Sequence, residues 1–127
     1  MYHGETKRGE RYLTYMLYEI ARRKLFEAED TLDEVLTEKQ TAIREKRDTG
    51  QYDDRLKEAR SLIEDRETLL ELRTRELRNS EDIHDRVFCL RFLDKVKVHK
   101  IAAACNYSEA QIYRIIGEIN KFLKDDR

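Results

Sequence analysis

Apolar side chains recur at three- and four-residue steps along most of the chain, which is the spacing of one face of an α-helix. From about Glu10 to Arg47 the pattern is continuous and predicts one long helix. Gly50, at the end of the segment Asp48-Thr49-Gly50, suits a C-terminal cap, so the helix is predicted to stop there. Its apolar stripe is formed by Leu13, Leu17, Ile20, Leu25, Ala28, Leu32, Val35 and Ile43.

A second helix is predicted from Tyr52 or Asp53 to about Arg78. Acidic Asp53 and Asp54 near its start favour the helix dipole. A short polar turn between two helices of this length predicts a long antiparallel, coiled-coil-like hairpin. Lys24, Lys39, Arg66 and Arg73 interrupt seam positions, where their aliphatic stems can still cover apolar surface. The stripe of the second helix comprises Leu56, Ala59, Ile63, Leu70 and Leu77, widened by Leu62, Leu69 and Leu72.

The segment Asn79-Ser80-Glu81-Asp82 marks the boundary after this hairpin. Ser80 is predicted to cap a third helix that ends near Asp94-Lys95. We therefore divide the chain into residues 1–79, a hairpin for dimerisation or partner contact, and residues 80–127, a compact head of three helices. The inner face of the third helix is predicted to carry Ile83, Val87, Leu90 and Leu93.

The stretch from Val98 to Ile116 predicts two helices joined by a tight turn, the order used to place a helix in the DNA major groove. Asn106 stands where the turn needs a left-handed residue. Ser108 and Gln111 form a capping-box pattern, and Tyr107 and Ile112 occupy the positions of a hydrophobic staple. Small Ala102 suits a close helix approach, and Ile101, Cys105, Ile112 and Ile115 are predicted to face inward. The same pattern also fits a purely structural helix pair.

Near the N-terminus, Tyr12, Tyr15 and Tyr18 cluster with Met16 on one helix. Packing against the head or against a second copy is the first interpretation of this aromatic patch, and binding to another partner is the second.

The segment from Arg91 to Ile115, RFLDKVKVHKIAAACNYSEAQIYRI, is similar to the C-terminal helix-turn-helix of sigma-70 factors, region 4. It resembles still more closely small phage-encoded transcriptional regulators that carry such a head behind a helical N-terminal part. The resemblance covers residues 83–124. It implies an all-helical, sequence-specific DNA-binding transcriptional regulator of phage or mobile-element origin, with RNA polymerase as a possible partner. No counterpart of sigma region 2 precedes the head.

In that family the second motif helix reads the major groove and the first contacts the DNA backbone. Carried onto this chain, the resemblance implies a reading face made of Ser108, Glu109, Gln111, Tyr113, Arg114, Gly117 and Lys121. It places Lys97, His99 and Lys100 near phosphate.

Composition changes this picture in two ways. Charged residues make up 42% of the 127 positions and proline is absent, which fits long exposed helices and favours self-association as a dimer. Residues 81–127 hold nine Lys or Arg against eight Asp or Glu, so one head should bind DNA weakly, and dimerisation would double its contacts.

The absence of an apolar run of membrane-span length and of a signal peptide predicts a cytoplasmic protein, and the two cysteines fit that setting.

The sequence contains no pattern of side chains that is typical of a catalytic site. His3, His84 and His99 are scattered, and Cys89, His99 and Cys105 lack the C-x-x-C spacing of a zinc site. We therefore predict neither enzyme activity nor a metal or cofactor. Two other functions remain open: a phage small terminase subunit, which would form a ring of many copies, and a helical protein-interaction module that does not bind DNA.

Overall fold

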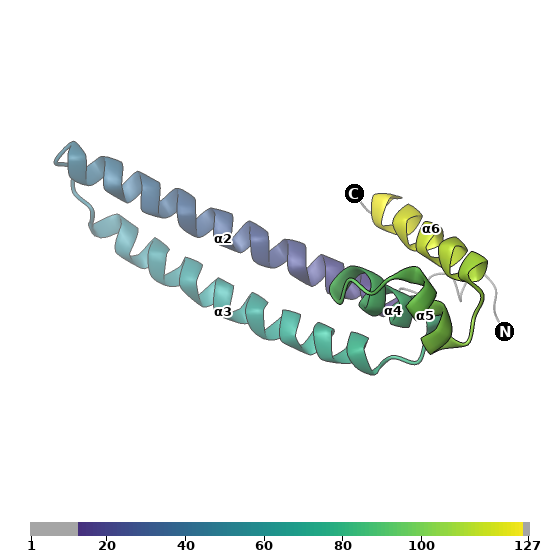
Figure 1. Cartoon of the computed structure of the whole chain (residues 1–127). Helices are drawn as coiled ribbons and strands as arrows, with labels where there is room; N and C mark the ends of the chain where they lie inside the picture. Colours follow the sequence, from purple (N-terminus) through teal and green to yellow (C-terminus); the bar gives the residue numbers. More distant parts are fainter. Residues whose placement is uncertain (1–12, 126–127) are drawn as a thin grey trace. The chain divides into compact units, whose positions relative to one another are not determined.

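The computed structural model describes residues 13–125, and all regular structure in that range is helical (Figure 1). Residues 1–12 and 126–127 lie outside this description, and with them Tyr12 and the predicted start of the first helix at Glu10. The prediction of an all-helical fold is confirmed for the described range. The helices are α2 (Thr14–Arg44), α3 (Gly50–Asn79), α4 (Ile83–Phe88) with its π-helical continuation η1 (Cys89–Leu93), α5 (Val98–Cys105) and α6 (Glu109–Asp125).

The chain packs as two compact units. Residues 20–72 form one unit, which we call the hairpin unit. Residues 13–19 and 73–125 belong to the other, which we call the C-terminal unit. The sequence placed a boundary between residues 79 and 80, whereas by packing the first turns of α2 and the last turns of α3 belong with the C-terminal helices.

Within the hairpin unit, α2 and α3 run side by side in opposite directions (Figure 1). Near the turn they share a small apolar core of Val35, Ala42, Tyr52 and Leu56, with Leu32 and Leu36 at its margin. Two ion pairs flank this core, Lys39 with Asp53 at 3.1 Å and Arg55 with Glu38 at 2.9 Å. Exposed pairs of this kind contribute at most about 1 kcal/mol each, so apolar burial holds the hairpin together.

The buried positions of α2 in this unit repeat every seven residues and are small. Ala21, Ala28, Val35 and Ala42 are at most 3% exposed. A seven-residue repeat is the pattern of a coiled-coil seam, and alanine allows two helices to approach closely. Lys39 and Arg66 are half-buried on the inner side of their helices, as the sequence predicted, whereas Lys24 is exposed.

The turn between α2 and α3 differs from the prediction. The left-handed residue that ends α2 is Lys46, with φ of 58°, and the predicted cap at Gly50 is wrong because Gly50 is the first residue of α3. The Arg47 N–H donates to the Ala42 carbonyl at 2.8 Å and the Lys46 N–H donates to the Ile43 carbonyl at 3.0 Å, which together form a Schellman motif. The Asp48 carboxylate accepts from the Gly50 N–H at 3.0 Å and starts the next helix.

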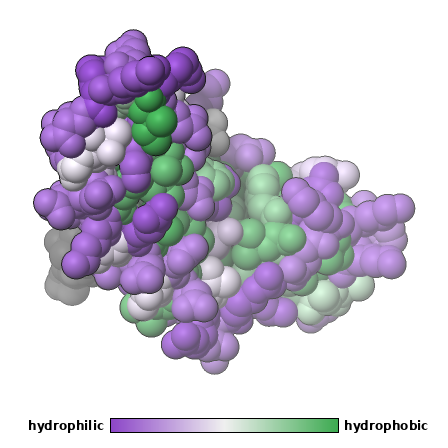
Figure 2. All heavy atoms as spheres, turned by 90° about the vertical axis from the view of Figure 1, so that its left-hand side faces the viewer, coloured by the Kyte–Doolittle hydropathy of each residue, from purple (hydrophilic) through white to green (hydrophobic). Residues whose placement is uncertain are grey.

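Several apolar residues predicted for the two stripes are exposed instead of buried. Ile43 is 57% exposed, Leu72 is 42% exposed and Leu62 is 37% exposed. Two paired helices bury only the seam between them. Because the seam residues of α2 are small, the apolar side chains beside the seam stay exposed to solvent. Figure 2 looks onto the turn end of α2 and α3 and shows hydrophilic side chains over most of that face, with hydrophobic ones between them.

The C-terminal unit has a larger core, in which aromatic rings from α2, α4 and η1 meet. Tyr15 stacks on Phe88 with ring centroids 5.1 Å apart, and Phe88 stacks on Phe92 at 5.2 Å. Tyr18 meets Phe88 edge-on at 5.9 Å. Tyr15 and Met16 are buried in this core, which confirms that the described part of the aromatic patch packs against the C-terminal helices. The predicted inner residues of the third helix, Ile83, Val87, Leu90 and Leu93, contribute to the same core.

A buried carboxylate organises the start of α2 in this unit. Asp85 of α4 is 1% exposed, and its Oδ1 accepts from the backbone N–H of Tyr15 at 3.0 Å. Its Oδ2 accepts from the Ser80 hydroxyl. The first N–H groups of a helix have no partner within the helix, so Asp85 satisfies one of them from 70 residues away. Burial, followed by the charges of Asp85 and Asp82, raises the pKa of Tyr15 well above its usual value.

Ser80 does not cap the third helix, because Asp82 occupies that position. The Asp82 carboxylate accepts from the N–H groups of His84 at 2.8 Å and Asp85 at 3.3 Å. Ser80 accepts from the Asp82 N–H at 3.2 Å while it donates to Asp85. Asp82 therefore caps α4, and Ser80 links Asp82 to the buried carboxylate of Asp85.

The end of the third helix lies at Asp94-Lys95, as predicted, but its last turn is wider than an α-helix. The Asp94 N–H donates to the Cys89 carbonyl at 2.9 Å, a π-helical bond. Lys95 is left-handed, with φ of 60°, and the Val96 N–H returns to the Leu90 carbonyl at 2.8 Å. This turn places Leu90, Phe92 and Leu93 at the edge of the core.

Asp85→Ala is expected to lower the free energy of unfolding by about 2–3 kcal/mol, because it leaves the buried Tyr15 N–H without an acceptor. Asp85→Asn keeps one acceptor oxygen and should lose about half as much. Urea unfolding measures both, with exposed Glu81→Ala as the control. An Asp85→Ala protein as stable as the control would show that the carboxylate does not organise this unit.

Candidate nucleic-acid interface

The turn between α5 and α6 has the conformation that the sequence predicted. Asn106 is left-handed, with φ of 61° and ψ of 44°. The Tyr107 N–H donates to the Ala102 carbonyl at 2.9 Å and closes the end of α5. Asparagine tolerates this backbone region better than most residues with a side chain.

The capping box at the start of α6 is confirmed in both directions. The Gln111 N–H donates to the Ser108 hydroxyl oxygen at 3.1 Å, and the Ser108 N–H donates to the Gln111 side-chain oxygen at 2.9 Å. At the two staple positions, Ile112 is fully buried while Tyr107 is 38% exposed. The side chains of Ser108 and Gln111 therefore fix the start of the helix.

The residues beneath the turn form a continuous apolar layer. Ile101 and Ala102 of α5, together with Cys105 at its end, are buried against α6. Ile112 and Ile115 are buried on the facing side, as predicted, and Ile119 continues the same row. Because these positions point inward, the opposite side of α6 is turned to solvent.

All ten residues predicted for the interface are exposed. Three of them lie at the start of α5 or just before it: Lys97, His99 and Lys100. The other seven lie in the turn or on α6: Ser108, Glu109, Gln111, Tyr113, Arg114, Gly117 and Lys121. They lie in one part of the C-terminal unit, because α5 and α6 pack against each other.

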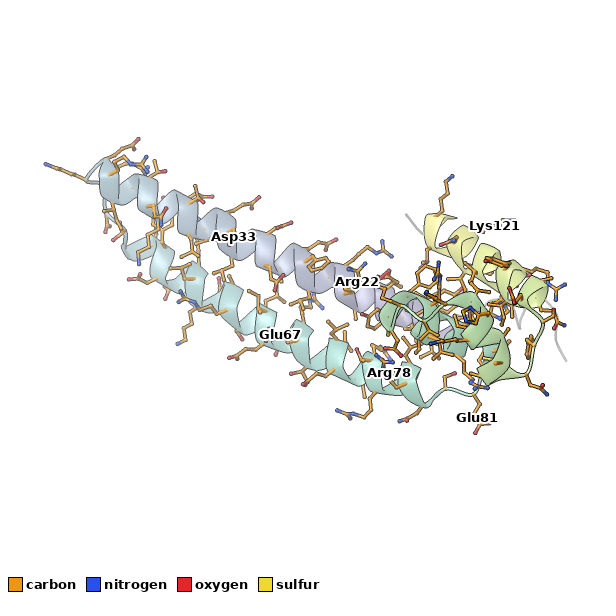
Figure 3. All side chains as sticks on the ribbon, in the orientation of Figure 1. Arg22, Asp33, Glu67, Arg78, Glu81 and Lys121 are labelled. Carbon is orange, nitrogen blue, oxygen red and sulfur yellow. The ribbon has the colours of Figure 1, made fainter. Side chains whose placement is uncertain are left out.

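Only some of the residues predicted for the reading face lie at the centre of the exposed face of α6. Helical spacing places Arg114, Gly117 and Lys121 directly opposite the buried row. Lys121 is labelled near the C-terminal end of α6 in Figure 3. Ala110 and Lys124 are also exposed on this face, and the sequence analysis missed both. Their three- and four-residue steps from Arg114 and Lys121 were the signal that could have found them.

The acidic residues of this unit are mostly engaged in structural contacts. Asp94 pairs with Arg78 at 2.9 Å, and Glu118 accepts a hydrogen bond from His84 with 2.7 Å between Oε1 and Nε2. Asp82 and Asp85 serve as the cap and the buried acceptor described above. Between residues 83 and 124 the chain carries eight Lys or Arg and only four Asp or Glu. Over α5 and α6 themselves, four Lys or Arg stand against three Asp or Glu, a net charge of +1 that equals the net charge over residues 81–127.

Gly117 is unusual on this face because nothing in the fold requires a glycine there. A Cβ atom built at Gly117 would meet no atom within 4 Å, and Asn106, Lys46 and Lys95 are the described residues with positive φ. A glycine inside a helix costs about 0.5–1 kcal/mol relative to alanine. The position therefore gives up helix stability without a gain in packing within the described chain.

The cysteines do not add a reactive or metal-binding centre to this surface. Cys89 and Cys105 are both buried and neither forms a disulfide. Burial raises the pKa of the Cys89 thiol, and its Sγ lies 3.8 Å from the Leu77 carbonyl oxygen. Among residues 13–125, no three His, Cys, Asp or Glu side chains are grouped so that they could hold a metal ion.

In the same part of the chain, no helix is both long and apolar enough to cross a membrane. Comparison with models of protein families, with curated proteins and with solved structures found no match.

Asn106→Val should destabilise the protein by about 1–2 kcal/mol, because a β-branched residue resists the left-handed region. Asn106→Gly is the matched control and should be neutral or slightly stabilising, since glycine adopts this conformation freely. Thermal and urea unfolding of the two variants measure the difference. Equal stability of the valine and glycine variants would mean that the turn is not left-handed at this residue.

Proposed function

We propose that α5, the turn and α6 form a helix-turn-helix that binds double-stranded DNA, and that the protein is a transcriptional regulator. The observation that supports this most is the exposed face of α6, where Arg114 and Lys121 flank Gly117 opposite a fully buried row. The turn fixes the angle at which this face is presented. A fixed helix with basic side chains on its outer face is the arrangement that enters the major groove.

The proposed roles divide by position. Arg114 lies in the middle of the outer face, where a guanidinium can donate two hydrogen bonds to one guanine. Lys97 and Lys100 lie near the N-terminus of α5, and in this proposal they contact phosphate together with His99. Glu109 stands in the first turn of α6, where it favours the helix dipole. The resemblance to sigma region 4 supports the same division, and it makes RNA polymerase a proposed second partner.

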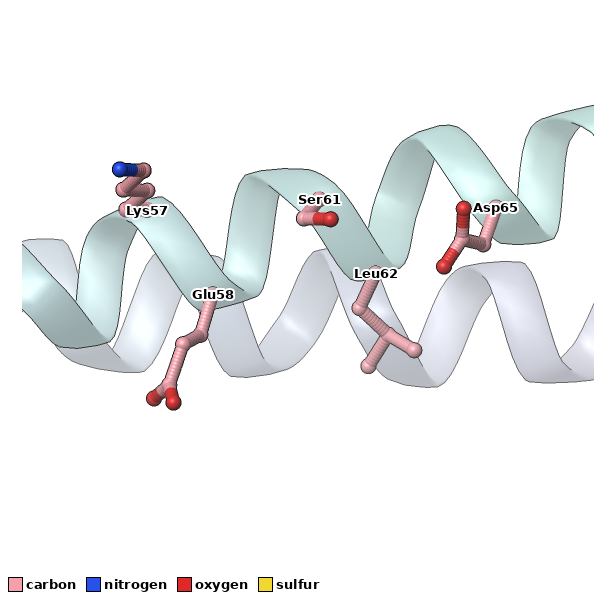
Figure 4. Close-up of a pocket in the computed structure, with 5 residues that line it drawn as sticks. All are labelled: Lys57, Glu58, Ser61, Leu62 and Asp65. Carbon is pink, nitrogen blue, oxygen red and sulfur yellow. The ribbon is translucent and has the colours of Figure 1, made fainter.

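A single copy is expected to bind DNA weakly, and self-association would strengthen the binding. Phosphate contacts normally dominate DNA binding, and one interface offers few cations. We propose that the hairpin unit associates with a second copy, because Phe26 and Ile43 of α2 and Leu62 of α3 are exposed there. Figure 4 shows Leu62 in a shallow depression on α3, beside Lys57, Glu58, Ser61 and Asp65.

A second candidate function is protein interaction without DNA. Tyr113 is 60% exposed on α6 and Phe122 is 42% exposed near its end. Exposed aromatic residues are enriched at protein interfaces. The charges of Arg114 and Lys121 favour DNA, and the following experiment separates the two functions.

Titration of a fluorescent duplex, at two salt concentrations, tests the proposal with three variants. Arg114→Ala should reduce discrimination between a selected site and a scrambled one by about 1–3 kcal/mol. Lys100→Ala should weaken binding to both sequences alike and lower the slope of log affinity against log salt by about one. Arg75→Ala, an exposed change on α3 outside both the hairpin unit and the proposed interface, is the control and should leave binding unaltered.

The mass of the complex, measured on the same samples, reports the number of copies on each duplex, and two copies are expected. If selection enriches no sequence and no duplex binds at low salt, the DNA proposal fails and the interaction module takes its place.

A further inference from the structure

Gly117 is a position where the chain gives up helix stability without a gain within the fold. It lies in the middle of α6 and has no positive φ, and a Cβ atom built there would meet no atom of the described residues within 4 Å. Packing within the described residues therefore does not explain why a side chain is absent there. A partner that approaches the helix backbone at this point would account for the missing side chain.

The charges around Gly117 indicate what kind of molecule approaches. Arg114 stands three residues before it and Lys121 four residues after it, both exposed and both on the same face. The nearest acid on α6 is Glu118, whose carboxylate is hydrogen-bonded to His84 on the flank of the helix. The surface at Gly117 is thus bordered by two cations, which suits an anionic partner more than an apolar or cationic one.

We infer that Gly117 is the point of closest approach between α6 and DNA, where the missing side chain lets the helix backbone come near the groove wall. This rests on the proposed DNA binding. With a side chain at residue 117, the helix would stand farther from the duplex. Arg114 and Lys121 would then have to span a longer gap, and hydrogen bonds weaken steeply once their geometry departs from the ideal.

Gly117→Ala separates this role from a structural one, because stability and binding should change in opposite directions. The added methyl group meets nothing in the fold and alanine favours the helix, so the midpoint of thermal unfolding should rise by a few degrees. Binding of the full chain to a fluorescent mixed-sequence duplex at low salt should weaken by about tenfold or more, because Arg114 would stand too far from the DNA for good hydrogen bonds.

Asn120→Ala is the matched control. It lies on α6, is exposed, and raises helix propensity, but it points to the side of the Arg114–Lys121 face. It should stabilise the protein and leave DNA binding as in the wild type.

Three results would overturn the inference, and they are distinguishable. If the wild type binds the duplex and Gly117→Ala binds it equally well, Gly117 is not the point of approach, while the proposed DNA binding stands. If Gly117→Ala unfolds at a lower temperature than the wild type, the glycine is required by the fold. If the wild type binds no duplex at low salt, the proposed function itself fails and this inference fails with it.

Discussion

The buried carboxylate of Asp85 is the constraint on which the C-terminal unit depends. It accepts from the first turn of α2, 70 residues away in the sequence, and from Ser80 in the link between α3 and α4, so one side chain joins these two segments. An uncompensated buried carboxylate would be strongly unfavourable, so the hydrogen bonds from Tyr15 and Ser80 are needed to stabilise Asp85 in the core. The aromatic rings of Tyr15 and Phe88 then stack beside it, and α4 provides a surface on which α6 packs. The exposed face of α6 is positioned as a result.

Periodicity along the sequence was sufficient to predict the helices and much of the core, because burial of a helical face follows a fixed spacing. It was not sufficient for helix ends that depend on contacts elsewhere. Lys46 ends α2 in place of Gly50, although a non-glycine residue costs more in the left-handed region. The π-helical turn before Lys95 and the exchange of roles between Ser80 and Asp82 depend on how the third helix meets the core. The bond from Asp85 to Tyr15 spans 70 residues and leaves no local pattern.

The turn between α5 and α6 was predictable because it is built from contacts within a few residues. Asn106, Ser108 and Gln111 adopt the predicted conformations and bonds since each acts on its own neighbours. The electrostatics of the surface were less predictable. A charge count treats all carboxylates alike, whereas Glu118 is bonded to His84, which lies 34 residues away. A nearly neutral sequence can therefore present a basic face.

Backbone amide NMR of the isotope-labelled full chain, with and without duplex DNA, tests most directly whether α6 is the surface that meets DNA. The account predicts that the largest shift changes occur at residues 110–121, with smaller ones near Lys97 and Lys100. Amides of residues 20–72 should change little on addition of DNA, because that unit contacts protein in this proposal. Changes concentrated in the hairpin unit, or no change at saturating duplex and low salt, would contradict the assignment of α6 as the DNA-binding helix.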